Sequence, residues 1–164
     1  MKSLLILRHA KSSWKNKYLS DHDRPLNKRG KRDAPRMGQL IRNEDLVPDL
    51  ILTSSAERAL KTAEAAADAC GFEDEIQIVR SFYHGSIGTY HDVLSQVSDK
   101  ISRVLIVGHN PGLEDFLEDL IGVWERLPTA ALAHITLPIR SWKNFDEQIE
   151  GHLENLWVPR ELSP

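Results

Sequence analysis

Three short, wholly apolar runs constrain the fold of this chain more than any other feature of its sequence. They cover residues 4–7, 50–52 and 104–107. A run with no polar position is typical of a strand that is covered on both faces of a sheet. Helix-forming stretches separate the runs, and this alternation predicts parallel strands joined by right-handed crossovers. We therefore expect an α/β sandwich with a mostly parallel central sheet.

The remaining elements follow from the spacing of apolar residues. Alanine content and helical periodicity predict three helices, at residues 27–43, 56–69 and 113–121. Proline disrupts the interior of a helix, so Pro35 counts against a helical first half of the segment at residues 27–43. Two further strands are expected at residues 134–137 and 145–153.

The composition excludes several classes of protein. The chain has 164 residues, 41% of them hydrophobic and 27% charged, so we expect one globular domain over residues 1–164. A single cysteine, Cys70, cannot form an intramolecular disulfide and argues for a reducing compartment. A formal net charge of −3 gives no overall attraction for nucleic acid or anionic lipid. We expect a cytoplasmic monomer that binds neither nucleic acid nor a membrane.

Each apolar run leads into polar residues that can bind anions. Arg8 and His9 directly follow the first run. Arg58 comes shortly after the second run, and His109 shortly after the third. In open α/β sheets, ligands bind beyond the carboxyl ends of the parallel strands. We therefore expect these four side chains to meet at one edge of the sheet.

The segment after the second run contains a local conflict that points to an anion. Residues 54–57 match a capping box, which predicts Ser54 as the N-cap of the following helix. Arg58 then lies in or next to the first helical turn, where a cation opposes the helix dipole unless an anion sits between them. The alternative is that Arg58 only pairs with a neighbouring carboxylate.

A second helix start follows the third run, because Asn110 suits an N-cap and Pro111 suits the first helical position. His109 would then stand just before a helix N-terminus. Two arginine forks suit phosphate oxygens, one imidazole can attack phosphorus, and a second can donate hydrogen bonds. Phosphoryl transfer needs mainly positioning and charge neutralisation, so these groups suffice without a metal. The sequence thus predicts a metal-independent phosphate pocket.

These residues resemble the histidine phosphatase superfamily, whose members carry an Arg-His-Gly motif after the first strand. Here the motif reads Arg8-His9-Ala10, and the second arginine and histidine correspond to Arg58 and His109. The resemblance implies a three-layer α/β/α sandwich of the phosphoglycerate mutase type, in this chain without a large helical cap. It also implies that His9 is phosphorylated transiently, with no cofactor. The phosphoryl oxygens would be held by Arg8, Arg58 and His109.

Within the superfamily, the chain is most similar to the short phosphohistidine phosphatases of the SixA type. Residues 21–30 resemble their Arg-Pro-Leu-Thr-x-x-Gly stretch, which implies that Arg24 adds to the phosphate pocket. The structural alternative for Arg24 is a turn that leads into a helix. Residues 127–133 are similar too, as a loop and strand that line the site. The short chain leaves no room for the helical insertions of larger relatives, so we expect a shallow, open site that admits a phosphorylated side chain of another protein.

The general acid is the part of the site that the sequence leaves most open. Superfamily members that act on phosphate esters usually carry a carboxylic acid between the second arginine and the second histidine. The titratable residues in that interval include Glu73, Asp74, Glu75, His84, His91, Asp92 and Asp99. We favour His84, with a surface histidine as the alternative. A phosphoramidate such as phosphohistidine depends less on an acid than an alkyl ester does, which favours that substrate.

Two other functions remain as alternatives at this stage. One is a small-molecule phosphomonoesterase or mutase-like enzyme, and the other is a non-catalytic module that binds phosphate. The basic residues within residues 28–32 are either a solvated helix face or a surface that steers an acidic or phosphorylated partner. The expected partner is therefore a phosphorylated protein or a small phosphorylated molecule.

Overall fold

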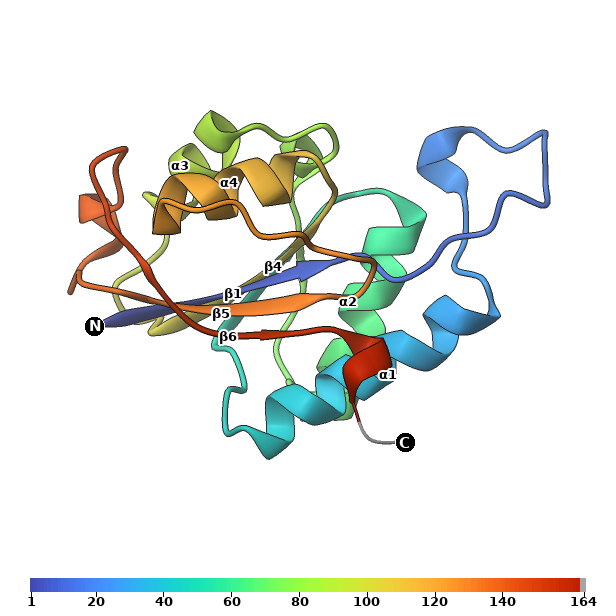
Figure 1. The fold of residues 1–164 in the computed structure, drawn as a ribbon, viewed down its shortest axis with the longest axis horizontal. Helices are drawn as coiled ribbons and strands as arrows, with labels where there is room; N and C mark the ends of the chain where they lie inside the picture. Colours follow the sequence, from blue (N-terminus) through green and yellow to red (C-terminus); the bar gives the residue numbers. More distant parts are fainter. Residues whose placement is uncertain (163–164) are drawn as a thin grey trace.

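Six strands form one sheet in the order β3-β2-β4-β1-β5-β6 in the computed structural model, which describes residues 1–162 (Figure 1). Strands β3, β2, β4 and β1 are parallel to one another, while β5 runs antiparallel to β1 and β6 antiparallel to β5. The predicted, mostly parallel sheet is confirmed. The strands are β1 (Lys2–Arg8), β2 (Leu50–Thr53), β3 (Gln77–Ile78), β4 (Arg103–Gly108), β5 (Leu132–Leu137) and β6 (His152–Trp157).

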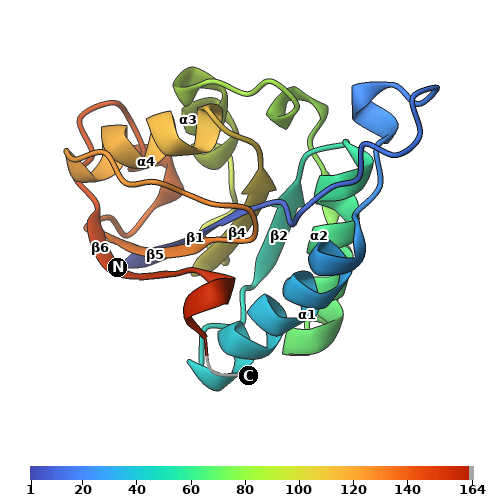
Figure 2. The ribbon, with the colours of Figure 1, turned by 45° about the vertical axis from the view of Figure 1, so that its right-hand side comes forward.

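Helices cover both faces of this sheet. Two of them pack on one face and two on the other, which gives the expected three layers (Figure 2). No large helical cap is built from residues 1–162, and none of their helices has the length and apolar character needed to cross a lipid bilayer. The helices are α1 (Lys28–Asn43) and α2 (Glu57–Cys70) on one face, and α3 (Ile87–Leu94) and α4 (Gly112–Ile121) on the other.

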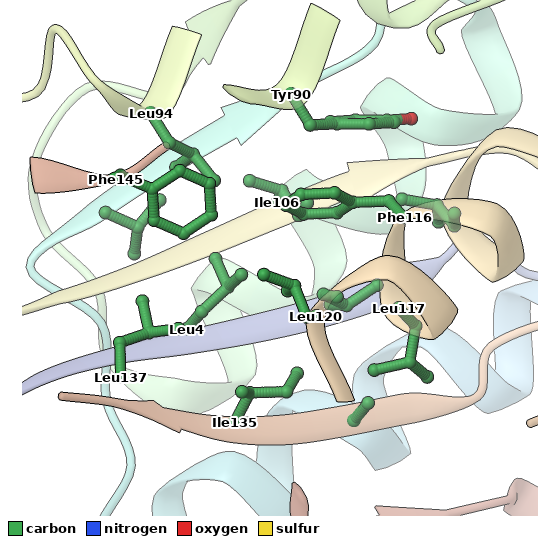
Figure 3. Close-up of a cluster of buried hydrophobic side chains, with 14 of the residues drawn as sticks. Leu4, Tyr90, Leu94, Ile106, Phe116, Leu117, Leu120, Ile135, Leu137 and Phe145 are labelled. Atoms are coloured by element: carbon green, nitrogen blue, oxygen red, sulfur yellow. The ribbon is translucent and has the colours of Figure 1, made fainter. Parts of the chain in front are cut away.

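The side chains of β1 explain why the first apolar run has no polar position. Leu4 and Ile6 belong to the buried cluster under α3 and α4, whereas Leu5 and Leu7 belong to the cluster under α1 and α2. Successive side chains of a strand point to opposite faces, so a strand with a helical layer on each side must be apolar throughout. Figure 3 shows the first cluster, in which Phe116 of α4 faces the sheet.

The helix α1 continues through Pro35, and its start is fixed by Asn27, whose side chain accepts a hydrogen bond from the backbone N–H of Gly30 at 2.9 Å. Near its middle, Gly38 lies against the backbone of Ala66 in α2, where any side chain would clash. The two helices therefore pack closely, and α2 carries Arg58 in its first turn.

Two helix starts differ from the sequence prediction. Helix α2 begins at Glu57 with Ala56 as its N-cap, so the predicted capping box at Ser54 is wrong. Helix α4 begins at Gly112 with Pro111 as its N-cap, so Asn110 is not the cap either. Both polar side chains make tertiary contacts instead, as described below, and local helix signals cannot show such contacts. The strand predicted at residues 145–153 is confirmed only at its end, since β6 begins at His152.

Candidate active site

The loops that follow β1, β2 and β4 meet at one edge of the sheet, as predicted. The backbone N–H of His9 donates to the carbonyl of Gly108 at 3.1 Å, and the rings of His9 and His109 lie 5.1 Å apart between centroids. The Thr62 hydroxyl accepts from the backbone N–H of Ala10 at 3.0 Å and donates to the carbonyl of Arg58 at 2.7 Å. This buried hydroxyl ties the loop after β1 to the helix that carries Arg58.

His9 is held in one tautomer by its own chain. Its Nδ1 lies 2.7 Å from the carbonyl oxygen of Ala10, and a carbonyl can only accept, so Nδ1 carries the hydrogen. The lone pair of Nε2 is then available for attack. His9 is only 7% exposed, and burial, assisted by nearby His109 and Arg58, lowers its pKa to about 3. The ring is neutral at physiological pH, as a nucleophilic imidazole must be.

His109 is held from the opposite side of its ring. Its Nε2 lies 2.7 Å from the hydroxyl oxygen of Ser54, which is fully buried, while its Nδ1 has no hydrogen-bond partner among residues 1–162. Burial, with the charge of Arg58 next in size, lowers the pKa of His109 to about 4. A phosphoryl group beside this ring would favour its protonated form, because an opposite charge within a few ångströms raises the pKa of an imidazole.

Arg58 and Arg24 meet around one carboxylate, that of Asp21. Arg58 donates to an Asp21 carboxylate oxygen at 3.0 Å and to its backbone carbonyl at 2.6 Å, and Arg24 donates to the other carboxylate oxygen at 3.1 Å. The Tyr83 hydroxyl donates to the same carboxylate at 2.6 Å, and this bond, with those of the arginines, holds the pKa of Asp21 well below its usual range. Arg58 thus does pair with a carboxylate, and that carboxylate marks a place where an anion is stabilised.

Arg24 is buried behind this carboxylate rather than in an open cavity. Its guanidinium donates to the Ser12 hydroxyl at 2.7 Å and lies over the Trp14 ring, 3.5 Å from the ring centroid. Trp14 is largely exposed and Arg24 is buried, so the Trp14 ring covers the guanidinium on its solvent side. Arg24 is therefore connected to Arg58 by the Asp21 carboxylate, with which both arginines form ion pairs.

The charge of Arg8 contributes to the lowered pKa of His9. The Arg8 side chain nevertheless lines a different cavity from Arg58 and His109. Its guanidinium donates to the carbonyl of Leu127 at 3.0 Å, and its Nε is buried with no partner among residues 1–162. Burial, with the nearby Arg126 and Arg58, lowers the pKa of Arg8, while Glu114 raises it. The carbonyl of Leu127 also accepts from the side chain of Asn110 at 2.8 Å, which explains why Asn110 is not free to cap α4.

A cavity of about 490 Å³ opens beside His109. His84 lines it, with its ring centroid 4.1 Å from that of Tyr83 and with a left-handed backbone (φ 65°) that is uncommon for a residue with a side chain. His91 does not line this cavity; it is buried elsewhere, and its Nε2 lies 2.9 Å from an oxygen of Asp119. The other acids that were considered from the sequence are exposed and do not line it: Glu73, Asp74, Glu75, Asp92 and Asp99.

Sequence reasoning missed several polar residues of this region. Asp21, Tyr83 and Asp115 line the same cavity as His109. Asp115 lies in the first turn of α4, where an acidic residue is common in any helix and indicates no role in a site. Ser54 and Thr62 bracket the motif around Arg58, and their short spacing to Arg58 was the only signal that could have indicated a role. No group of three or more His, Cys, Asp or Glu side chains within residues 1–162 is arranged to hold a metal ion.

The sequence matches the profile of the histidine phosphatase superfamily (branch 1) over residues 4–103. This chain belongs to that superfamily. A chloroplastic protein of Arabidopsis thaliana is 36% identical over 151 residues, which cover 85% of this chain and 68% of that protein. A protein of Mycobacterium tuberculosis is 30% identical over 138 residues, which cover 77% of this chain and 84% of the relative.

Solved structures are similar over nearly the whole chain. A protein of Agrobacterium tumefaciens, assigned as the phosphohistidine phosphatase SixA, has a TM-score of 0.80 and 28% identity, and the match covers 96% of this chain and 98% of that one. The protein histidine phosphatase SixA, solved with tungstate, has a TM-score of 0.84 over 98% of this chain and 99% of its own. At 21% identity, the second likeness shows the fold alone.

Proposed function

We propose that this chain is a metal-independent phosphatase that removes the phosphoryl group from phosphohistidine in proteins, through a covalent phosphohistidine at His9. The observation that carries the proposal is the state of His9. Its Nδ1–H is committed to the carbonyl of Ala10, its pKa is lowered to about 3, and its Nε2 lone pair is therefore available at physiological pH.

In the first step, Nε2 of His9 attacks phosphorus. The new P–N bond forms as the P–N bond to the substrate imidazole breaks, and the electron pair of that bond stays on the substrate nitrogen, which takes up a proton. His84 faces the cavity and is the proposed proton source. Arg58, Arg8 and the imidazolium of His109 would neutralise the phosphoryl oxygens, which is the main requirement of phosphoryl transfer.

In the second step, a water oxygen attacks the phosphorus of phosphorylated His9. The P–Nε2 bond breaks, its electron pair returns to Nε2, the proton of water passes to solvent, and inorganic phosphate leaves. A phosphate oxygen in the site competes with the Asp21 carboxylate for Arg58 and Arg24, so we propose that Asp21 gives way when substrate binds.

Two observations favour a protein as substrate. The described chain has no large helical cap over the site, and a structural relative at 28% identity is assigned as a phosphohistidine phosphatase. One observation favours the alternative, a small-molecule phosphomonoesterase. Asp115 lines the cavity beside His109 and could supply the carboxylic acid that alkyl esters require. We further propose that the chain works as a single-domain monomer in the cytoplasm, as its composition predicts.

The test compares a histidine-phosphorylated protein, phosphoramidate and p-nitrophenyl phosphate as substrates of the wild type and of His9→Ala. We expect faster turnover of the two phosphoramidates than of the ester. His9→Ala should lose about 10⁴-fold or more in kcat, since it removes the nucleophile. His152→Ala is the matched control, because His152 is exposed and lies on β6 at the opposite end of the sheet. Retained turnover in His9→Ala, or failure to trap a phosphoenzyme, contradicts the mechanism, and a preference for the ester contradicts the substrate.

A further inference from the structure

A second cavity, of about 380 Å³, lies beside Arg8 and is lined by six basic side chains and one carboxylate, Asp33. We name it the basic groove. The chain as a whole carries more acidic than basic residues, with a formal net charge of −3, so the composition does not account for this concentration of positive charge. The basic side chains are those of Arg8, Lys11, Arg29, Arg32, Arg126 and Arg160.

The fold assembles the basic groove from segments that are far apart in the sequence. Lys11 follows β1, Arg29 and Arg32 lie on α1, and Arg126 lies in the loop before β5. Arg160 belongs to a 3-10 helix (Pro159–Glu161) that rests against α1 (Figures 1 and 2). The basic patch seen in the sequence of α1 is therefore one wall of a concave site and not only a solvated helix face.

The positive charge of the groove is poorly neutralised within the protein. Asp33 is the only carboxylate in the lining, and three arginines share it: Arg32 at 3.3 Å, Arg36 at 3.5 Å and Arg29 at 3.9 Å. Within residues 1–162, Arg126 and Arg160 form no ion pair. Repulsion from Arg126 also contributes to the lowered pKa of Arg8. Clustered like charges oppose folding, so a bound anion would stabilise this arrangement.

The character of the groove indicates what kind of anion it binds. Arginine forks match carboxylates and phosphates equally well. Sites for small molecules are mostly apolar and enclosed, whereas the side chains of Arg29 and Arg32 are 52% and 63% exposed. Exposed cations around a concave surface suit the electrostatic recognition of another protein. Arg8 lines the groove, and its charge also acts on His9, so the groove adjoins the candidate site.

We propose that the basic groove binds acidic side chains, Asp or Glu, that flank the phosphorylated residue of the substrate protein. The inference rests on the proposed function and narrows it to phosphoproteins whose modified histidine lies in an acidic segment. The groove would recognise charge and leave the chemistry to His9, so it should act on KM more than on kcat.

The test uses two histidine-phosphorylated peptides of equal length, one with glutamates and one with glutamines around the phosphohistidine. The enzymes are the wild type, Arg126→Gln/Arg160→Gln, and the control Lys100→Gln/Arg140→Gln. The control removes the same charge from exposed residues near the start of β4 and the end of β5, at the opposite edge of the sheet. The side chains of Arg126 and Arg160 make no hydrogen bond or ion pair within residues 1–162, so their loss should not impair folding, and thermal unfolding checks this.

We expect the wild type to have a KM about fivefold to tenfold lower for the glutamate peptide, as for a few surface ion pairs. Arg126→Gln/Arg160→Gln should remove most of this preference, and the control should keep it. Salt should weaken the preference as well, since exposed charges are screened. The unphosphorylated glutamate peptide should inhibit phosphoramidate hydrolysis by the wild type more strongly than the glutamine peptide does.

Each contrary outcome identifies which proposal fails. Equal KM values for both peptides, with His9-dependent turnover, overturn the groove and leave the phosphatase intact. No turnover of either peptide, with good turnover of phosphate esters, overturns the proposed substrate, and the inhibition by unphosphorylated peptides still tests the groove. Inhibition by inorganic tripolyphosphate that depends on Arg126 and Arg160, without inhibition by the glutamate peptide, shows a small polyphosphate ligand and overturns the acidic segment.

Discussion

The two histidines of the site occupy equivalent places in the fold and are held in opposite ways. Each follows a parallel strand, β1 or β4, and each is buried enough to have a strongly lowered pKa. The ring of His9 is fixed through Nδ1 by the carbonyl of the next residue, Ala10. The ring of His109 is fixed through Nε2 by Ser54, which lies 55 positions away in the sequence.

This difference separates a nucleophile from a residue that binds charge. A carbonyl can only accept, so it forces His9 into the tautomer with an unprotonated Nε2. A hydroxyl can donate or accept, so Ser54 can hold His109 in either protonation state, and His109 can become a cation when a phosphoryl group arrives. A contact with the backbone of the next residue thus fixes the orientation and tautomer of the nucleophile. The orientation of the residue that binds charge is fixed by a side chain that is distant in the sequence.

The largest effect that tests this comparison is expected for His109→Ala. The variant loses a donor to the phosphoryl oxygens, and such losses reduce kcat by about 10²–10³-fold. It should still form phosphorylated His9 in a single turnover, which His9→Ala cannot. Steady-state kinetics together with acid-stable and acid-labile phosphate analysis of the protein measure both. If His109→Ala forms no phosphoenzyme, the two histidines are not divided as described.

A smaller effect is expected for Ser54→Ala. This change leaves Nε2 of His109 without its buried partner, which costs about 1–1.5 kcal/mol and corresponds to about a tenfold fall in kcat/KM. Ser55→Ala is the matched control, because the neighbouring hydroxyl bonds to His22 at 2.9 Å and not to His109. Equal kinetics for the two variants would show that Ser54 does not position His109.

The smallest effect is on pH dependence and sharpens the comparison without changing a residue. The pKa values of about 3 for His9 and about 4 for His109 predict that neither ring titrates between about pH 7.5 and 5 without ligand. In the unfolded chain both rings take up protons near pH 6.5, so the free energy of unfolding should fall as pH drops from there toward 4. NMR titration and chemical denaturation measure these two quantities. Added phosphate should raise the pKa of His109 above 5 and leave that of His9 below 5. A rise above 5 for His9 and not for His109 would contradict the assignment.

The sequence was sufficient to predict the sheet edge on which the site lies. Residues 4–7 and 104–107 are apolar at every position because helices cover both faces of β1 and β4, and parallel strands bring their following loops together. Arg8, His9 and His109 needed no further information to be placed near one another. Their roles stay predictions that the kinetic tests address.

The parts that the sequence did not reveal depend on loops that meet far from their neighbours in the chain. Tyr83 reaches Asp21 across 62 positions, and neither residue belongs to a periodic pattern. Capping signals are local, so they predict Ser54 as a helix cap, whereas in the structure its hydroxyl lies against His109. The sequence of α1 shows two basic residues of the groove, Arg29 and Arg32, close together. The other basic residues of the groove lie in segments that share no sequence pattern, so only the fold brings them together.

The central position of β1 also has a consequence for how the protein is made. Leu4 is paired with Val104, 100 positions later in the sequence, on one side and with Ile135, 131 positions later, on the other. Residues 103–108 and 132–137 must therefore both be synthesised before β1 has both of its neighbours. Pairings of such long range slow folding, and an incomplete chain leaves an apolar, aggregation-prone strand exposed. A chain that ends before β5 would therefore expose apolar surface that chaperones bind. It would not fold into a protein that is merely less active.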